Sequence, residues 1–231
     1  MKLALSQNLT SKVSAVFDPA THSNIKAFYK FKSLGGADIS NVANWTDQTG
    51  NFDMLQATDS EKPQYTASTG AVSFDGANES LQTASDISLA SQFTIGVRMN
   101  ITGSINNDVI LADNTTTGHF IRIKDSTTIT IRIAGSTAQD FGLNTGTIQD
   151  ATNFNLIVSR DDDGLIKTFF NGTEQADTNT RTGTLLIDAI GVRKTDANDL
   201  GGSIFEVQIY DGVSFSTAGF ITKINNRLAS L

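Results

Sequence analysis

The chain has 231 residues, a formal net charge of -7 and no cysteine, which excludes disulfides and thiolate metal sites. The acidic balance, with no basic stripe between aromatic residues, argues against a nucleic-acid partner. No apolar run approaches the roughly 18 residues of a membrane span, and the first apolar patch is too short for a cleaved leader. We therefore expect a soluble chain without a signal peptide or a membrane partner.

Residues 1–24 show no sustained alternation and contain an Asp-Pro break, so they are predicted to form an N-terminal arm. From the stretch "KAFYKFK" onward the hydrophobic period changes to two, and Phe28 and Leu34 bracket a predicted short strand and loop. The main domain is therefore predicted to span residues 25–231.

Short segments of alternating apolar and polar residues follow, separated by turn residues, and this pattern indicates strands with one buried face. The predicted strands are 70–76, 79–84, 92–101, 107–113, 118–124, 127–135, 153–160, 164–172, 185–193 and 202–212. This number and spacing of strands is typical of an all-β sandwich or barrel.

The C-terminal segment changes to helical spacing. Ser216 is predicted to cap a helix whose apolar stripe faces the domain. The stripe consists of Phe220, Ile221, Ile224, Leu228 and Leu231.

The stretch "SRDDDGLIKTFFNGTEQ" places three aspartates before Gly164 and between two apolar runs. Gly164 can adopt a positive φ and the aspartates can bond the local backbone, so Asp161 to Gly164 are predicted to form a hairpin tip. Asn171-Gly172 is predicted to form a second turn.

Four stretches in order, 42–65, 70–82, 156–172 and 201–224, resemble the laminin-G-like branch of the concanavalin A-like lectin/glucanase jelly rolls. They match the family's W-x-D-x-S-G-N loop, its "F-D-G" strand pair, its "R-D…N-G" hairpin and its "E-V-x-I-Y-D" strand before a closing helix. Thr49 replaces the usual serine and Phe170 the usual tyrosine. The resemblance implies a two-sheet antiparallel jelly-roll sandwich with a short C-terminal helix and an N-terminal arm.

Catalysis is not expected. Glucanase relatives carry paired carboxylates on one strand, whereas the four glutamates here share no strand at the required spacing. A glycanase acting through Glu206 or Glu79 is the weakest alternative. His119 is expected to face solvent at a strand end rather than to serve a catalytic triad.

Calcium is the one cofactor that the sequence leaves open, since loop carboxylates and amides are its usual ligands. Asx-type turns and solvated loops are the favoured explanation for the same residues. The candidate donors are Asp75, Asn78, Asp161, Asp163, Asp188 and Asp199.

Sugar binding usually needs exposed aromatic rings beside polar groups. Trp45 and Tyr65 are the candidates, and packing at the sandwich edge is the simpler explanation for both rings.

The leading prediction is a non-enzymatic interaction protein of a bacteriophage virion, a capsid decoration or tail-associated protein. Its partners would be a capsid or tail protein, or a second copy of itself. The alternative is a carbohydrate-binding adhesin module that holds a cell-surface glycan in its rim loops, with calcium as an optional helper.

Overall fold

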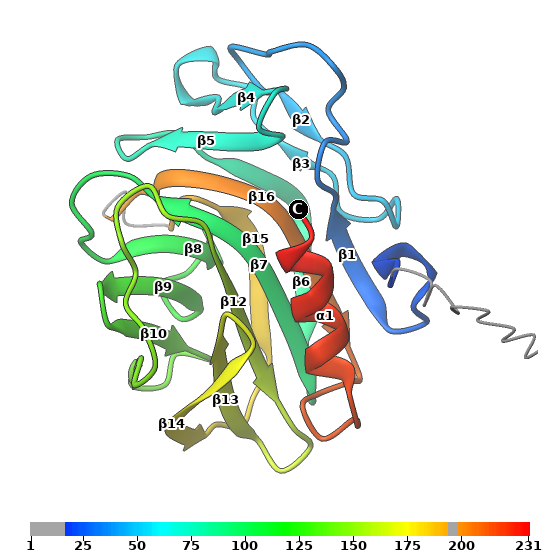
Figure 1. Ribbon diagram of the computed structural model, residues 1–231, viewed down its shortest axis with the longest axis vertical. Helices are drawn as coiled ribbons and strands as arrows, with labels where there is room; N and C mark the ends of the chain where they lie inside the picture. The colour runs from blue at the N-terminus through cyan, green and yellow to red at the C-terminus, as the bar shows by residue number, and fades with distance from the viewer. Residues whose placement is uncertain (1–16, 194–197) are drawn as a thin grey trace, which may run out of the picture.

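The structure is a computed structural model that describes residues 17–193 and 198–231. Two antiparallel sheets pack face to face, and the helix α1 (Phe220–Ala229) lies across the outer surface of one of them (Figure 1). This arrangement confirms the predicted sandwich with a C-terminal helix. No helix among the described residues is long and apolar enough to cross a bilayer.

The first sheet has β16 near its centre. Its order is β14 (Thr173–Thr180), β13 (Leu165–Phe170), β12 (Phe154–Arg160), β7 (Phe93–Ile101), β16 (Gly201–Asp211), β5 (Ala71–Asp75) and β4 (Gln64–Thr66), and β1 (Ile25–Tyr29) also pairs with β16.

The second sheet faces it across the core. Its order is β11 (Gln139–Gly142), β10 (Thr128–Arg132), β9 (Phe120–Asp125), β8 (Asp108–Ala112), β15 (Leu185–Ile190), β6 (Leu81–Leu89), β3 (Met54–Leu55) and β2 (Asn44–Trp45). Two short 3-10 turns, η1 (Pro19–Thr21) and η2 (Asp59–Glu61), lie outside the sheets.

Alternation along the strands builds the core, as β9 and β10 illustrate. Ile121 pairs with Ile131 and Ile123 with Ile129, and all four side chains are buried between the sheets. Arg122, between the two isoleucines of β9, points to the opposite face and lies over the Phe120 ring. A period of two therefore gives one buried and one outer face, as predicted.

The predicted strands are all present, and the hairpin turns have the expected backbone. Asp161 to Gly164 join β12 to β13, with Gly164 at φ 83°. Asn171 and Gly172 join β13 to β14 at φ 49° and 83°. The sequence pattern did not reveal five strands, because they are very short or carry almost no apolar alternation: β2, β3, β4, β11 and β14.

The predicted helix exists, but its predicted cap is wrong. It begins at Phe220 after Gly219, which adopts a left-handed conformation at φ 71°, so Ser216 lies in the preceding turn. The stripe is as expected, with Phe220, Ile224 and Leu228 buried. The helix packs closely because Gly96 lies beneath it, where a Cβ would approach Ile224 Cγ2 to 2.7 Å.

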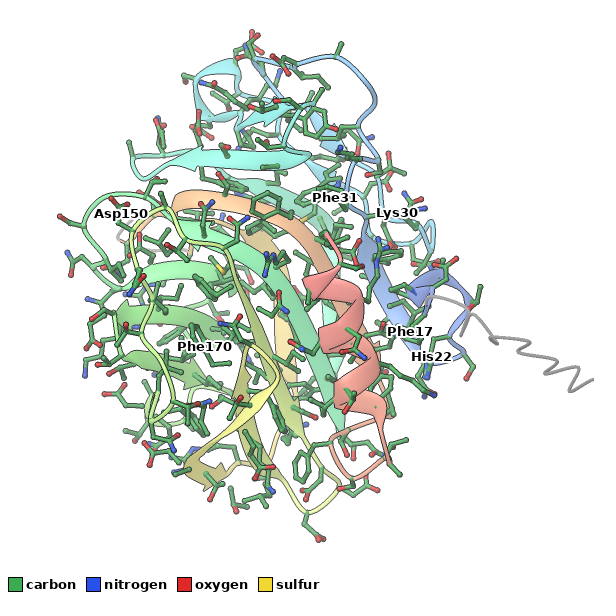
Figure 2. All side chains as sticks on the ribbon, viewed as in Figure 1. Phe17, His22, Lys30, Phe31, Asp150 and Phe170 are labelled. Atoms are coloured by element: carbon green, nitrogen blue, oxygen red, sulfur yellow. The ribbon has the colours of Figure 1, made fainter. Side chains whose placement is uncertain are left out.

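The described N-terminal segment is joined to the helix by aromatic packing. The His22 ring lies 5.4 Å from the Tyr210 ring and 5.0 Å from the Phe220 ring, with Phe17 against its other side (Figure 2). The predicted arm, residues 1–24, falls mostly on residues 1–16, which lie outside the described residues.

A buried ion pair ties the helix to the first sheet. Glu206 on β16 is fully buried, and its carboxylate accepts hydrogen bonds from Arg227 Nε at 3.0 Å and Arg227 Nη2 at 2.6 Å. Gln208 Nε2 donates to the same carboxylate at 2.8 Å, and the Phe31 amide donates at 3.2 Å. Glu206 is therefore fully occupied by structural contacts.

Replacing Arg227 with methionine leaves the Glu206 charge buried without its partner. We expect a loss of about 3–5 kcal/mol in the free energy of unfolding, measured by urea denaturation. Lys124→Met is the matched control, because it breaks a surface pair with Asp140 whose side chains are 43% and 47% exposed. It should cost less than about 1 kcal/mol. Equal losses in the two variants would contradict the structural role of Glu206.

Candidate functional site

Three loops meet at the end of the sandwich where β5 and β7 end and β16 begins. They are the β5–β6 turn, the β7–β8 loop and the β15–β16 connection, on the left of Figure 1. Residues 194–197 of that connection lie outside the described residues. We call the hollow between these loops the rim groove.

The rim groove has two adjoining cavities that share Asp199. The larger, of about 340 Å³, is lined by Asp75, Gly76, Thr102, Ser104, Asn106, Asp108, Asn198, Asp199 and Gly201. The smaller, of about 280 Å³, is lined by Glu61, Ala77, Asn78, Ser80, Gln82, Asn114, Val192 and Asp199.

Carboxylates hold the loops around the larger cavity in place. Asp108 is 5% exposed and accepts hydrogen bonds from the Gly201 amide at 3.2 Å and the Asn106 amide at 2.8 Å. Asp150, labelled in Figure 2, accepts from the Gly103 amide at 2.8 Å. These bonds fix the backbone of the β7–β8 loop and of Gly201 at the start of β16.

The β5–β6 turn is closed in the same way. Asp75 Oδ1 accepts from the Ala77 amide at 2.9 Å, while the Glu79 carboxylate accepts from the Asp75 amide at 2.9 Å. Burial raises the pKa of Glu79, and the nearby charge of Asp75 adds to this rise. Glu79 faces the turn and is not among the residues that line the groove.

The lining is rich in hydrogen-bond acceptors. It consists of carboxylates, side-chain amides, hydroxyls and backbone, with Ala77 and Val192 as its apolar side chains, and among the described residues no aromatic, lysine or arginine side chain contributes to it. Carboxylate and amide oxygens accept hydrogen bonds from hydroxyl groups, while amide nitrogens donate to hydroxyl oxygens. A ligand with many hydroxyl groups matches this chemistry.

The six predicted calcium donors fall in three separate places. Asp75, Asn78 and Asp199 line the rim groove. Asp161 and Asp163 lie at the opposite end, where Arg160 pairs with Phe93 at the start of β7. Asp161 Oδ1 there accepts from the Leu165 amide at 2.8 Å, which fits the predicted hairpin tip.

Asp188, the sixth candidate, lies on the second sheet with two other acids. Its carboxylate and those of Asp86 and Asp113 offer oxygens within 4.8 Å of one another. Burial raises the pKa of Asp188, and the negative charges of Asp113 and Asp86 raise it further. Asp113 accepts from the amides and hydroxyls of Thr115 and Thr116, so this carboxylate shapes its own loop.

The predicted sugar-stacking roles of Trp45 and Tyr65 do not fit the structure, because the two residues are 1% and 2% exposed. Trp45 Nε1 donates to Ser33 Oγ at 3.2 Å, and the Tyr65 hydroxyl donates to the Gly35 carbonyl at 2.9 Å. Neither ring presents a face to a ligand. The alternative expectation, packing at the sandwich edge, describes both.

The loop after Trp45 is organised by Asp47, which sequence reasoning did not single out. Its buried carboxylate accepts from the amides of Phe28, Thr49, Asn51 and Phe52 at 2.7–3.1 Å. The Thr49 hydroxyl donates to the same carboxylate. Threonine therefore supplies the hydroxyl that the usual serine would supply at this position.

His119 is 8% exposed, so the expectation that it faces solvent is wrong. Its Nδ1 accepts from the Ala134 amide at 3.2 Å and the Leu186 amide at 3.3 Å. Burial lowers its pKa, opposed by the charges of Asp113 and Asp86 and aided by that of Arg132. The imidazole therefore serves as a neutral structural acceptor.

A family comparison agrees with this geometry. The laminin G-type model of the concanavalin A-like lectin/glucanases superfamily matches residues 75–216. The chain belongs to this superfamily. Comparison with curated protein sequences gives no match.

Solved structures share the lectin/glucanase fold with this chain at low identity. Domain 4 of AbnA, a GH43 extracellular arabinanase from Geobacillus stearothermophilus in complex with arabinotriose, has TM-score 0.59 and 15% identity, covering 89% of this chain and 98% of that one. Trypanosoma rangeli sialidase in complex with sialic acid has TM-score 0.58 and 11% identity, covering 91% of this chain and 33% of that one.

The ligand binding domain of botulinum neurotoxin serotype D in complex with N-acetylneuraminic acid gives TM-score 0.57 and 12% identity, covering 84% of this chain and 50% of that one. The chain thus spans nearly all of the arabinanase domain, about a third of the sialidase and half of the toxin fragment. At these identities the likeness establishes the fold.

The neutral His119 makes stability depend on pH. Its folded pKa lies below the ordinary value of 6.5, so the unfolded chain binds the proton more readily and stability falls as pH drops below about 6.5. His119→Asn keeps an acceptor near Nδ1 that does not titrate. We expect the variant to lose less melting temperature than the native chain between pH 7.5 and 5.5. An unchanged pH dependence would contradict this account. His22→Asn is the comparison, since burial also lowers the pKa of His22.

Proposed function

We propose that the protein is a non-catalytic, lectin-like module that binds a glycan in the rim groove. The observation that carries this proposal is a pair of adjoining cavities of about 340 and 280 Å³ lined by carboxylates, amides and hydroxyls. Sugars offer dense hydroxyl groups to such a surface. Membership of a lectin/glucanase superfamily and the sugar ligands named for the arabinanase domain, the sialidase and the toxin support it.

The placement of the glutamates supports a binding role over hydrolysis. Retaining glycosidases need two carboxyl groups about 5–5.5 Å apart across the bond to be cleaved. Glu206 is buried against Arg227, Glu79 closes a turn, and Glu174 pairs with Lys167 at 2.7 Å. Of the four glutamates only Glu61 lines the groove. The glycanase alternative through Glu206 or Glu79 has no support from this geometry.

Calcium assistance remains a prediction within this proposal. Asp75, Asn78 and Asp199 supply oxygen atoms of the kind that calcium binds, from two loops of the groove. The two carboxylates and one amide would need further oxygens from backbone or ligand.

The expected place in a virus particle also stays a prediction, as do capsid or tail partners. The structures compared above come from enzymes and a toxin, so they add nothing to that expectation. We keep the division into an arm, 1–24, and a binding domain, 25–231, as part of the proposal; β1 begins at Ile25.

Changes to the lining of the rim groove should weaken glycan binding. Ser104 is exposed at the larger cavity, so Ser104→Trp places a large side chain inside it, while Asn106→Ala removes an amide from the lining. On a glycan array followed by calorimetry, we expect each variant to weaken binding at least about tenfold, equivalent to ~1.4 kcal/mol. Parallel measurements with EDTA test calcium.

Asp162→Ala is the control, because Asp162 is exposed at the opposite end of the sandwich and hydrogen-bonds Ser91 and Gln92 there. It should bind like the native chain. The absence of any selective glycan, or retention of full affinity in Ser104→Trp, would overturn the proposal.

A further inference from the structure

Two arginines gather at one aromatic ring in a chain whose net charge is -7. Arg122 on β9 and Arg193 just beyond β15 place their guanidinium carbons 4.9 and 5.2 Å from the centroid of the Phe120 ring. Phe120 is 2% exposed and packs with Val109 and Ala112, and cation–π attraction holds the two cations over its ring.

Unlike the other arginines, these two donate to no acceptor among residues 17–193 and 198–231. Of seven arginines in the chain, the other five all donate to described acceptors: Arg98, Arg132, Arg160, Arg181 and Arg227. Within the described residues, Arg122 and Arg193 donate no hydrogen bond and lie in no salt bridge. The Nε of each is buried without a partner.

Both arginines are half-buried, and holding two like charges side by side, each with a buried Nε that lacks a partner, is unfavourable. Burial lowers the pKa of Arg122, and the charge of Arg193 lowers it further; burial and then Arg132 do the same for Arg193. The acid that acts on Arg122, Asp140, is already bound by Lys124 Nζ at 2.5 Å and Thr130 Oγ1 at 2.7 Å. An external anion would satisfy both guanidinium groups.

This pair borders the rim groove. Arg122 on β9 pairs in register with Val109 on β8, and the preceding residue Asp108 lines the larger cavity. Val192, which lines the smaller cavity, directly precedes Arg193. The strands β8 and β9 lie side by side next to the rim loops (Figure 1).

We propose that Arg122 and Arg193 form a carboxylate-binding subsite beside the rim groove, which selects glycans that carry an acidic sugar. The inference rests on the proposed glycan-binding function and names its ligand class. Planar guanidinium groups bind carboxylates through paired hydrogen bonds, and Phe120 fixes their position. The hydroxyls of the same glycan contact the acceptor-rich groove, whose carboxylates would repel an acid placed there.

The test measures binding of four sugars to the full chain by calorimetry and NMR: N-acetylneuraminic acid, glucuronic acid and the methyl ester of each. We expect at least one acid to bind about tenfold or more tightly than its neutral ester. Arg122→Gln should remove that preference, whereas Arg181→Gln should keep it. Arg181→Gln is the control because it removes the same charge at the opposite end of the sandwich, where the Arg181 side chain donates to the Thr180 carbonyl. Melting curves confirm that each variant is folded.

The outcomes separate this inference from the proposed function. Equal affinity for acid and ester, with binding still lost in Ser104→Trp, overturns the subsite and keeps the glycan function. An acid preference that needs Arg122 but survives Ser104→Trp keeps the subsite and overturns the rim groove. Competition by inorganic phosphate as strong as by the free acid indicates a general anion patch and overturns the selectivity for acidic sugars.

Discussion

The arrangement of the first sheet and the helix depends on one interaction, the buried ion pair between Glu206 and Arg227. Glu206 lies on β16, which pairs with β7, β5 and β1, so this C-terminal strand joins three strands from the first half of the chain. One face of β16 enters the core through Val207 and Ile209, while the other carries Glu206 toward Arg227 of α1. Because Gly201 at the start of β16 lines the rim groove, the strand that anchors the helix also positions the groove.

Charge divides the binding end of the sandwich into two chemical environments. The groove presents carboxylates and amides whose loops are held by Asp108 and Asp150, and it suits neutral hydroxyl groups. The Arg122–Arg193 pair beside it suits an acid. Two adjacent environments of opposite charge would fix the orientation of a single acidic glycan, since the groove carboxylates repel the acid that the arginines attract. In the proposed site, selectivity would depend on sheet pairing as much as on loop sequence.

The sequence patterns predicted the strands well, because alternation reports burial directly, and Gly164 and Asn171-Gly172 identified their turns. The sequence patterns failed where contacts between distant residues decide whether a side chain is buried. Trp45 and Tyr65 were candidates for exposure, yet the loop around Asp47 and the backbone near Gly35 bury them. Asp75, Asn78 and Asp199, named as candidate calcium donors, line the groove. The run "GSINND", which contains Ser104, Asn106 and Asp108, has a similar composition and lines it too, but it was not singled out. Arg122 and Arg193 are distant in sequence and meet only through the pairing of β8 with β9 and β15.

The central claim is that a glycan binds at the rim loops. Backbone amide chemical shifts of the labelled protein, followed during titration with an acidic trisaccharide such as a sialyllactose, test it most directly. The account predicts shifts concentrated at Gly103, Asn106, Asn114 and Gly201, with no change at the Asp161–Gly164 turn. Shifts confined to that turn, or no shift at millimolar sugar, would contradict it.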